Sequence, residues 1–163
     1  MNQEKQYIEF WKFIGILHQA DLLRHLILIG SWAEYIYAQS GILPGYDANL
    51  RTLDVDFLIQ NRNQPRQEKS IVSLAKDNGY TVAYDVMYGT TKIFTSDFME
   101  IEFIIEQKGR GNLPVLNTNL GVRAQALRNM ALLKRVAIEI SIFGYDIIVP
   151  KPEAYVLHKI IIN

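Results

Sequence analysis

The chain has 163 residues, 49% hydrophobic and 11% aromatic, so it is long enough to close one sizeable core in a single domain. Seventeen Lys and Arg residues balance seventeen Asp and Glu residues, so the formal net charge is zero. This excludes binding of nucleic acid or an anionic membrane through the charge of the whole molecule. It has no cysteine for disulfides or thiolate metal sites, no signal-peptide pattern and no apolar run of about 18 residues; we expect a cytoplasmic protein without membrane segments.

Hydrophobic periodicity predicts alternating helices and strands as far as residue 106. Ile8, Trp11, Ile14 and Leu17 lie three apart within residues 4–19, which predicts an opening helix with an apolar stripe. Short apolar runs separated by Gly, Pro, Asn and Asp predict the elements that follow. These are a buried strand over 25–30, a helix over 31–40, strands over 52–60, 81–89, 91–96 and 98–106, and a helix over 67–78.

The last third of the chain differs in charge. From Gln107 to Ile138 there is no Asp or Glu. We expect the cations of this stretch to gather at the rim of the acid pairs described below, where they could bind phosphate groups such as those of an RNA backbone, with ordinary solvated charges as the alternative. They are Lys108, Arg110, Arg123, Arg128, Lys134 and Arg135.

Beyond the basic stretch, residues 136–150 predict a hairpin and residues 151–163 a helix opened by Pro152. That helix ends on three isoleucines and an asparagine without a cap. We therefore expect the natural chain to continue into a C-terminal helical region.

Two predicted strands carry a pair of acids on one face. Asp54 and Asp56 lie two apart in one strand, and Glu100 and Glu102 repeat the spacing in another, so each pair points to one side. An isolated pair of this kind is most often a solvated strand face. These strands are apolar enough to be central, however, and acids there must be desolvated or paired. A divalent cation would relieve their repulsion, and oxygen ligands without cysteine or clustered histidine favour Mg²⁺ over zinc.

A candidate anion site precedes the first acid pair. Gly30 and Ser31 lie where the buried strand meets the helix, which Ser31 is expected to cap and Gly41 to end. Free backbone N–H groups and the helix dipole attract phosphate at such a junction, and an ordinary turn followed by an N-cap is the alternative. The order of strand, Gly-Ser, helix and two acidic strands predicts neighbouring phosphate and metal sites.

Residues 26–59 resemble the signature of the nucleotidyltransferase superfamily that includes DNA polymerase beta, namely an apolar strand, Gly-[Gly/Ser], a helix and [Asp/Glu]-x-[Asp/Glu]. The gap of 24 positions from Gly30 to Asp54 and the Thr52 before the acids are similar to the abortive-infection-type bacterial nucleotidyltransferases, which implies a toxin–antitoxin setting. The resemblance covers most of the chain, because "MEIEFIIE" fits the strand of the third acid and "VPKPEAYVLHKI" resembles a later helix. It implies an α/β (α+β) fold with a central mixed β-sheet flanked by helices.

The resemblance also implies roles for individual residues. The family's third acid is usually Asp, so Glu100 stays a rival to Glu102 on the same face. Carried over by position, Gly30 and Ser31 would hold the β- and γ-phosphates of a nucleoside triphosphate (NTP), Asp54, Asp56 and Glu102 would be the catalytic acids and ligate two Mg²⁺ ions, and Lys159 would face the nucleotide.

Two functions follow as alternatives. The first is an enzyme that moves a nucleoside monophosphate (NMP) from ATP or another NTP to an unidentified acceptor hydroxyl on RNA or tRNA, a protein or a small molecule. The second is a catalytically weak or inactive module of the same fold that binds a nucleotide or a partner. The intact Gly-Ser and Asp-x-Asp motifs favour the enzyme.

Overall fold

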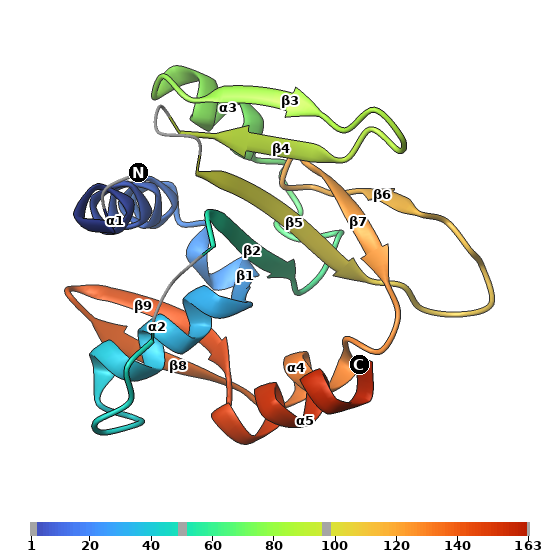
Figure 1. Cartoon of the computed structure of the whole chain (residues 1–163). Coiled ribbons are helices and arrows are strands. Elements are labelled where there is room, and N and C mark those ends of the chain that lie inside the picture. Colours follow the sequence, from blue (N-terminus) through green and yellow to red (C-terminus); the bar gives the residue numbers. More distant parts are fainter. Residues whose placement is uncertain (1–2, 49–51, 96–98, 163) are drawn as a thin grey trace.

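The structure, a computed structural model, describes residues 3–48, 52–95 and 99–162, which form a nine-stranded mixed sheet flanked by helices (Figure 1). The α/β fold expected from the sequence is confirmed. Its elements in chain order are α1 (Gln3–Gln19), η1 (Leu23–His25), β1 (Leu26–Ile29), α2 (Ser31–Ser40), β2 (Asp54–Ile59), α3 (Ile71–Asp77), β3 (Thr81–Tyr84), β4 (Thr91–Phe94), β5 (Glu100–Glu106), β6 (Val115–Asn117), β7 (Arg123–Leu127), α4 (Ala131–Arg135), β8 (Ala137–Ile142), β9 (Tyr145–Pro150) and α5 (Pro152–Ile162).

The sheet places the two acidic strands at its centre. Its order is β3-β4-β5-β2-β1-β9-β8, with β7 also pairing with β5 and β6 with β7. Strand β2 runs parallel to β5 and antiparallel to β1. Both strands that carry acid pairs are therefore flanked by strands on either side, as their apolar sequences predict.

The two faces of the sheet are covered unequally. Helices α1, α2 and α3 contribute Phe10, Trp32 and Ile71 to the main hydrophobic core, which also includes Phe57 of β2 and Phe103 of β5. A smaller cluster on the other face joins Leu58 and Met130 to the partly buried Ile104. Because side chains alternate along a strand, the acids at the beginnings of β2 and β5 lie on this second face, beyond the smaller cluster.

The opening helix is confirmed, but its buried stripe is shifted from the predicted one. Phe10, Phe13, Ile14 and Leu17 are buried, whereas Ile8 is 58% exposed. The helix packs through a wider apolar face than the strict three-residue spacing implies, because 3.6 residues make one turn.

Two predicted helix starts are corrected by the structure. Gly30, not Ser31, is the N-cap of α2, and Ser31 is its first helical residue. Helix α3 begins at Ile71 rather than at residue 67, because the Ser70 hydroxyl accepts a hydrogen bond from the Ser73 N–H at 3.1 Å and caps the helix there. The predicted end of α2 is confirmed, with Gly41 in the left-handed conformation.

The predicted hairpins are formed with shorter strands. The strand expected over 81–89 ends at Tyr84, and β8 and β9 form the hairpin expected over 136–150. The turn expected at 95–97 lies largely outside the described residues. Within the described ranges, no helix is long and apolar enough to cross a lipid bilayer.

Candidate active site

Strands β2 and β5 bring all four predicted acids onto one face of the sheet. The strands pair in parallel register, with Asp54 opposite Glu100 and Asp56 opposite Glu102. Paired residues on neighbouring strands, which lie about 4.8 Å apart, direct their side chains to the same side. Two acid pairs separated by 46 positions in the sequence thus become one acidic patch, which we define as Asp54, Asp56, Glu100 and Glu102.

Gly30 brings the start of α2 against this patch. Its φ of 72° and ψ of −161° belong to a region that is open to glycine and costly for other residues. A Cβ atom at this position would lie 3.0 Å from Oδ2 of Asp56. The absence of a side chain therefore lets the β1–α2 junction approach the Asp56 carboxylate closely.

Asp56 is the acid most strongly affected by its surroundings. Burial, followed by the negative charges of Glu102, Asp54 and Glu100, raises the pKa of Asp56 to about 7. The other acids of the patch therefore repel the charged form of Asp56 at neutral pH.

The pKa of Asp56 predicts how the stability of the metal-free protein depends on pH. Its folded pKa of about 7 exceeds the ordinary value of 3.8, so the folded state binds the proton more tightly and loses stability as pH rises between these values. Lowering the pH from about 8 to about 5.5 should thus raise the free energy of unfolding by up to ~2 kcal/mol through this group.

The measurement is urea unfolding at both pH values in the presence of a chelator, with Asp56→Asn as the comparison. The difference between the wild type and this variant isolates the contribution of Asp56. Equal pH dependence in the two proteins would show that Asp56 titrates normally.

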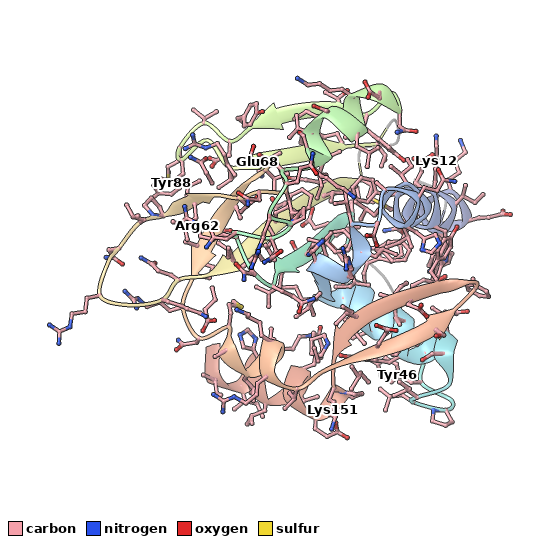
Figure 2. The ribbon with its side chains drawn as sticks, turned by 180° about the vertical axis from the view of Figure 1, so that it is seen from behind. Lys12, Tyr46, Arg62, Glu68, Tyr88 and Lys151 are labelled. Carbon is pink, nitrogen blue, oxygen red and sulfur yellow. The ribbon has the colours of Figure 1, made fainter. Side chains whose placement is uncertain are left out.

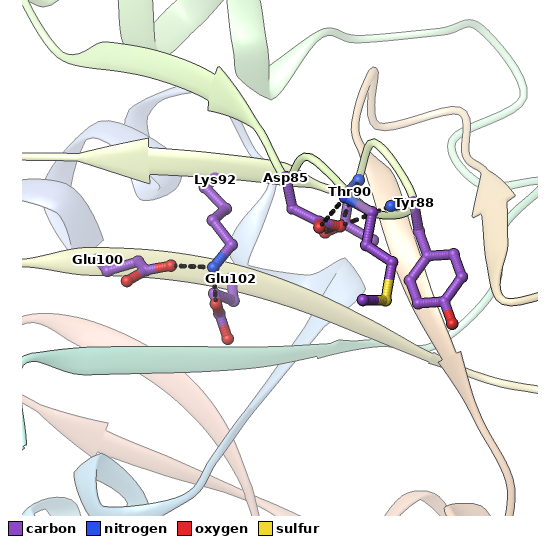
Figure 3. A network of polar contacts seen from close by, with 7 residues as sticks. Asp85, Tyr88, Thr90, Lys92, Glu100 and Glu102 are labelled. Carbon is purple, nitrogen blue, oxygen red and sulfur yellow. Dashed lines mark hydrogen bonds and ion pairs between the residues drawn. The ribbon is translucent and has the colours of Figure 1, made fainter.

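Lys92, on β4, is the cation nearest to the two glutamates (Figure 3). Its Nζ lies 2.5 Å from Oε1 of Glu100 and 2.9 Å from Oε1 of Glu102. Sequence reasoning missed this residue. The available signal was its alternation with the apolar Ile93 in a strand next to the acidic strand, because antiparallel pairing places Lys92 opposite Glu102.

The two glutamates respond differently to Lys92. Burial acts to raise the pKa of Glu100, but hydrogen bonds with Lys92 and Glu102 outweigh it and lower the pKa overall. The pKa of Glu102 is raised, because its burial and the nearby Glu100 outweigh Lys92. Glu102 is thus the more proton-attracting of the two, and it lies directly beside Asp56 in the sheet.

Lys159, on α5, lies near the start of α2. Its Nζ is 3.9 Å from Oε1 of Glu34 and 4.6 Å from the centre of the Tyr155 ring. The Tyr46 hydroxyl donates to the same Glu34 oxygen at 3.1 Å. Because Glu34 belongs to the first turn of α2, Lys159 is held close to the helix start that begins with Ser31.

The cations of the basic stretch do not all gather at the acidic patch. Lys108 and Lys134 line a cavity of about 400 Å³ with Gln60 and Glu106, at the ends of β2 and β5 opposite to the acids. Arg128 donates to the carbonyls of residues 109 and 111 at 2.9 and 2.6 Å. The expectation that the six cations line one acidic rim is therefore wrong, since parallel strands of five or more residues separate the two ends.

The acidic patch has the donor set of a Mg²⁺ site but is not arranged as one. Among the described residues, no three Asp, Glu or His side chains are grouped to hold a metal ion. The Lys92 ammonium instead occupies the cation position between Glu100 and Glu102. Four carboxylates on one face, one of them with a raised pKa, fit a hard divalent cation once the flexible Lys92 side chain releases a glutamate.

A comparison with protein-family models identifies the fold that carries this patch. A family model described as nucleotidyltransferase matches residues 9–163, from within α1 to the end of the chain. No curated protein and no solved structure matches the chain. The family match includes the Gly30–Ser31 junction, the acidic patch and Lys159, and the chain belongs to the nucleotidyltransferase family.

Proposed function

We propose that the protein transfers an NMP from an NTP to an acceptor hydroxyl, with release of pyrophosphate, at the acidic patch. The observation that supports this most is the parallel register of β2 and β5, which sets Asp56 beside Glu102 next to the Gly30 backbone. A helix start that can bind an anion and carboxylates on one sheet face beside it are two elements that phosphoryl chemistry needs.

The β1–α2 junction would hold the triphosphate. Backbone N–H groups of the first turn of α2 and the Ser31 hydroxyl would bind the β- and γ-phosphates, helped by the helix dipole. Lys159 would exchange its long contact with Glu34 for a phosphate oxygen. Hydrogen bonding to Tyr155, followed by the nearby charges, raises the pKa of Lys159, so this side chain stays positively charged.

The acidic patch would supply the metal ligands. Asp54, Asp56 and Glu102 would hold two Mg²⁺ ions, which when bound neutralise the triphosphate and activate the acceptor oxygen. Asp56 would lose its proton in that state, because a bound cation favours the charged carboxylate against the burial and the repulsion that raise its pKa. Lys92 would stay with Glu100 and leave Glu102 free, which makes Glu102 the third ligand and Glu100 its rival.

A second function is favoured by the same Lys92 contact. A lysine that permanently neutralises both glutamates would leave a nucleotide-binding module without turnover.

The closer similarity to abortive-infection-type enzymes rests on the 24-position spacing from Gly30 to Asp54 and stays a proposal.

Paired glutamate substitutions test the proposed function and the choice of the third ligand. Glu102→Gln is expected to lower NMP transfer by about 100-fold or more, because it removes a metal-binding charge. Glu100→Gln should lower it by less than about 10-fold, since its partner is Lys92. Transfer is measured as pyrophosphate release from labelled NTP in Mg²⁺ with an acceptor mixture.

The reverse ranking of the two variants would assign the third ligand to Glu100. Full activity in both variants would remove β5 from the chemistry. No pyrophosphate release by the wild type, with retained NTP binding, would establish the binding module in place of the enzyme.

A further inference from the structure

A second cavity opens directly beside the acidic patch. It has a volume of about 270 Å³ and lies between the tip of the β3–β4 hairpin, β5 and β7. Met87, Tyr88 and Gln125 line it together with Lys92 and Glu102. The cavity therefore shares Glu102 with the acidic patch and is also lined by Lys92, which pairs with that glutamate.

The hairpin tip is held rigidly by one aspartate (Figure 3). The Asp85 carboxylate accepts hydrogen bonds from the N–H groups of Met87 at 2.8 Å, Tyr88 at 3.2 Å and Thr90 at 3.4 Å. It also accepts one from the Thr90 hydroxyl at 2.9 Å. Backbone bonds between Asp85 and Thr90 and between Gly89 and Asp85, both 2.9 Å, close the turn. The tip is thus ordered before any ligand arrives.

Three apolar side chains of the hairpin tip are exposed to solvent. Val86 is fully exposed, Met87 is 75% exposed and Tyr88 is 49% exposed. Because Asp85 fixes the turn, these side chains have no route into the core, and exposed apolar groups of this kind mark contact surfaces. Met87 and Tyr88 border the cavity beside Glu102, so a ligand in the cavity would cover them.

The cavity lies where the acceptor of an in-line displacement would enter. Asp56 contacts the phosphate-binding junction at Gly30, on the β1 side of the acidic strands. Glu102 contacts Lys92 on the opposite, β4 side. Figure 2 shows Tyr88 at one edge of the molecule and Tyr46, which binds α2 through Glu34, at the other. Since the attacking oxygen lies opposite the leaving pyrophosphate, an acceptor would approach from the hairpin side.

The side chains around the cavity favour a nucleic acid as the ligand. The Tyr88 ring offers a flat face for a base and the Met87 thioether an apolar contact, while Thr90 and Gln125 offer hydrogen bonds to the base edge. The Arg123 guanidinium packs against the tip, since a Cβ at Gly89 would lie 3.8 Å from its Cζ. In the described ranges Arg123 has no salt-bridge partner, which leaves its charge available to a backbone phosphate.

We propose that this cavity binds the 3′-terminal nucleotide of a single-stranded nucleic acid, with its base stacked on Tyr88, and that this strand is the acceptor. Its role as acceptor rests on the proposed function, whereas its binding does not. The 3′-hydroxyl oxygen forms the new bond to the α-phosphorus as the bond to the pyrophosphate oxygen breaks. The hydroxyl proton passes to solvent water, and the electron pair of the broken bond leaves with pyrophosphate.

Binding of short fluorescent single-stranded RNA and DNA, measured by anisotropy without metal, tests the proposal. Tyr88→Ala is expected to weaken binding by about 10-fold, the loss of one stacked base, whereas Tyr88→Phe should bind like the wild type. Tyr84→Ala is the matched control, because Tyr84 lies on the same hairpin, is 52% exposed and does not line the cavity. Weaker binding at higher salt is expected from the phosphate contacts.

A photoreactive base at the 3′ end should crosslink to the hairpin peptide, and the same base at the 5′ end should not. Loss of RNA binding but not DNA binding in Tyr88→Ala identifies RNA as the ligand, and the converse identifies DNA. Equal binding by the wild type and Tyr88→Ala, crosslinking only from the 5′ end, or no binding by the wild type would overturn the proposal.

The proposed function and this inference fail separately. Asp54→Asn should abolish transfer and keep Tyr88-dependent nucleic-acid binding. Tyr88-dependent binding without any transfer by the wild type would overturn the proposed function and the acceptor role but support the binding site. Transfer to a protein acceptor that is unchanged in Tyr88→Ala would overturn the inference and keep the function.

Discussion

Replacing Asp56 with Asn is expected to lower NMP transfer by about two to three orders of magnitude and to leave the protein folded. Asp56 lies against the Gly30 backbone, where the phosphates are proposed to bind, and pairs in the sheet with Glu102, on the proposed acceptor side. Its charge can therefore act on both substrates. Loss of one preorganised charge-stabilising group has an effect of this size in other active sites. Asp54→Asn should behave in the same way.

The same change should make the metal-free protein more stable near pH 8. Asn has nearly the shape of Asp but carries no charge. It therefore removes the cost of burying a charged carboxylate and the repulsion from Glu102, Asp54 and Glu100, which together raise the pKa of Asp56. Asp77→Asn on the exposed end of α3 is the control for loss of an acid elsewhere and should change neither activity nor stability appreciably. An Asp56→Asn variant with wild-type transfer would remove Asp56 from the metal-binding residues.

Gly30→Ala is expected to destabilise the protein by at least ~2 kcal/mol and to abolish most activity. The φ of 72° with ψ of −161° is strained for any residue with a Cβ. The added methyl group would also lie 3.0 Å from Oδ2 of Asp56, so the carboxylate or the helix start must move. Urea unfolding measures the first effect, and pyrophosphate release at saturating Mg²⁺ measures the second.

Gly41→Ala is the matched control at the other end of α2. Gly41 also has a positive φ, 78°, but its Cβ would meet no atom within 4 Å. The Gly41→Ala substitution should therefore lower the free energy of unfolding by about 1 kcal/mol, from backbone strain alone, and leave transfer intact. Equal loss of activity in both glycine variants would show that the helix start needs general rigidity rather than close contact with Asp56.

The parts of the site that the sequence predicts are those fixed by local alternation. Two-residue spacing places Asp54 with Asp56, and Glu100 with Glu102, on one face, and their apolar neighbours place both strands at the centre of the sheet. Their parallel pairing in register is a long-range property of the fold.

Other features depend on contacts between distant segments. Lys92 joins the patch only because β4 pairs with β5, and a lysine in a short strand carries no such information by itself. The sequence predicts that the strand over 81–89 includes Val86 and Met87, because these residue types favour strands. In the structure the hydrogen bonds to Asp85 end the strand before them. Strand pairing therefore determines the place of Lys92, whereas local hydrogen bonds of Asp85 end the strand before Val86.

The stretch after residue 106 gave the least accurate prediction. Its lack of acids suggested that its cations gather at the rim of the acidic site, but β7 pairs with β5 while Arg128 binds the loop at residues 109–111. Backbone carbonyls and Glu106 therefore satisfy part of the charge far from the acidic patch. The number and order of charged residues in a sequence do not show where the fold places them.

Pyrophosphate release from each labelled NTP in Mg²⁺, with total RNA and cell extract as acceptors, tests the central proposal most directly. We expect release and transfer of label by the wild type, their loss on chelation of Mg²⁺, and their loss in Asp54→Asn and Asp56→Asn. Circular dichroism of both variants should confirm that they are folded. Label transfer that persists in both aspartate variants, or a folded wild type that releases no pyrophosphate with any acceptor, would contradict nucleotidyl transfer at this patch.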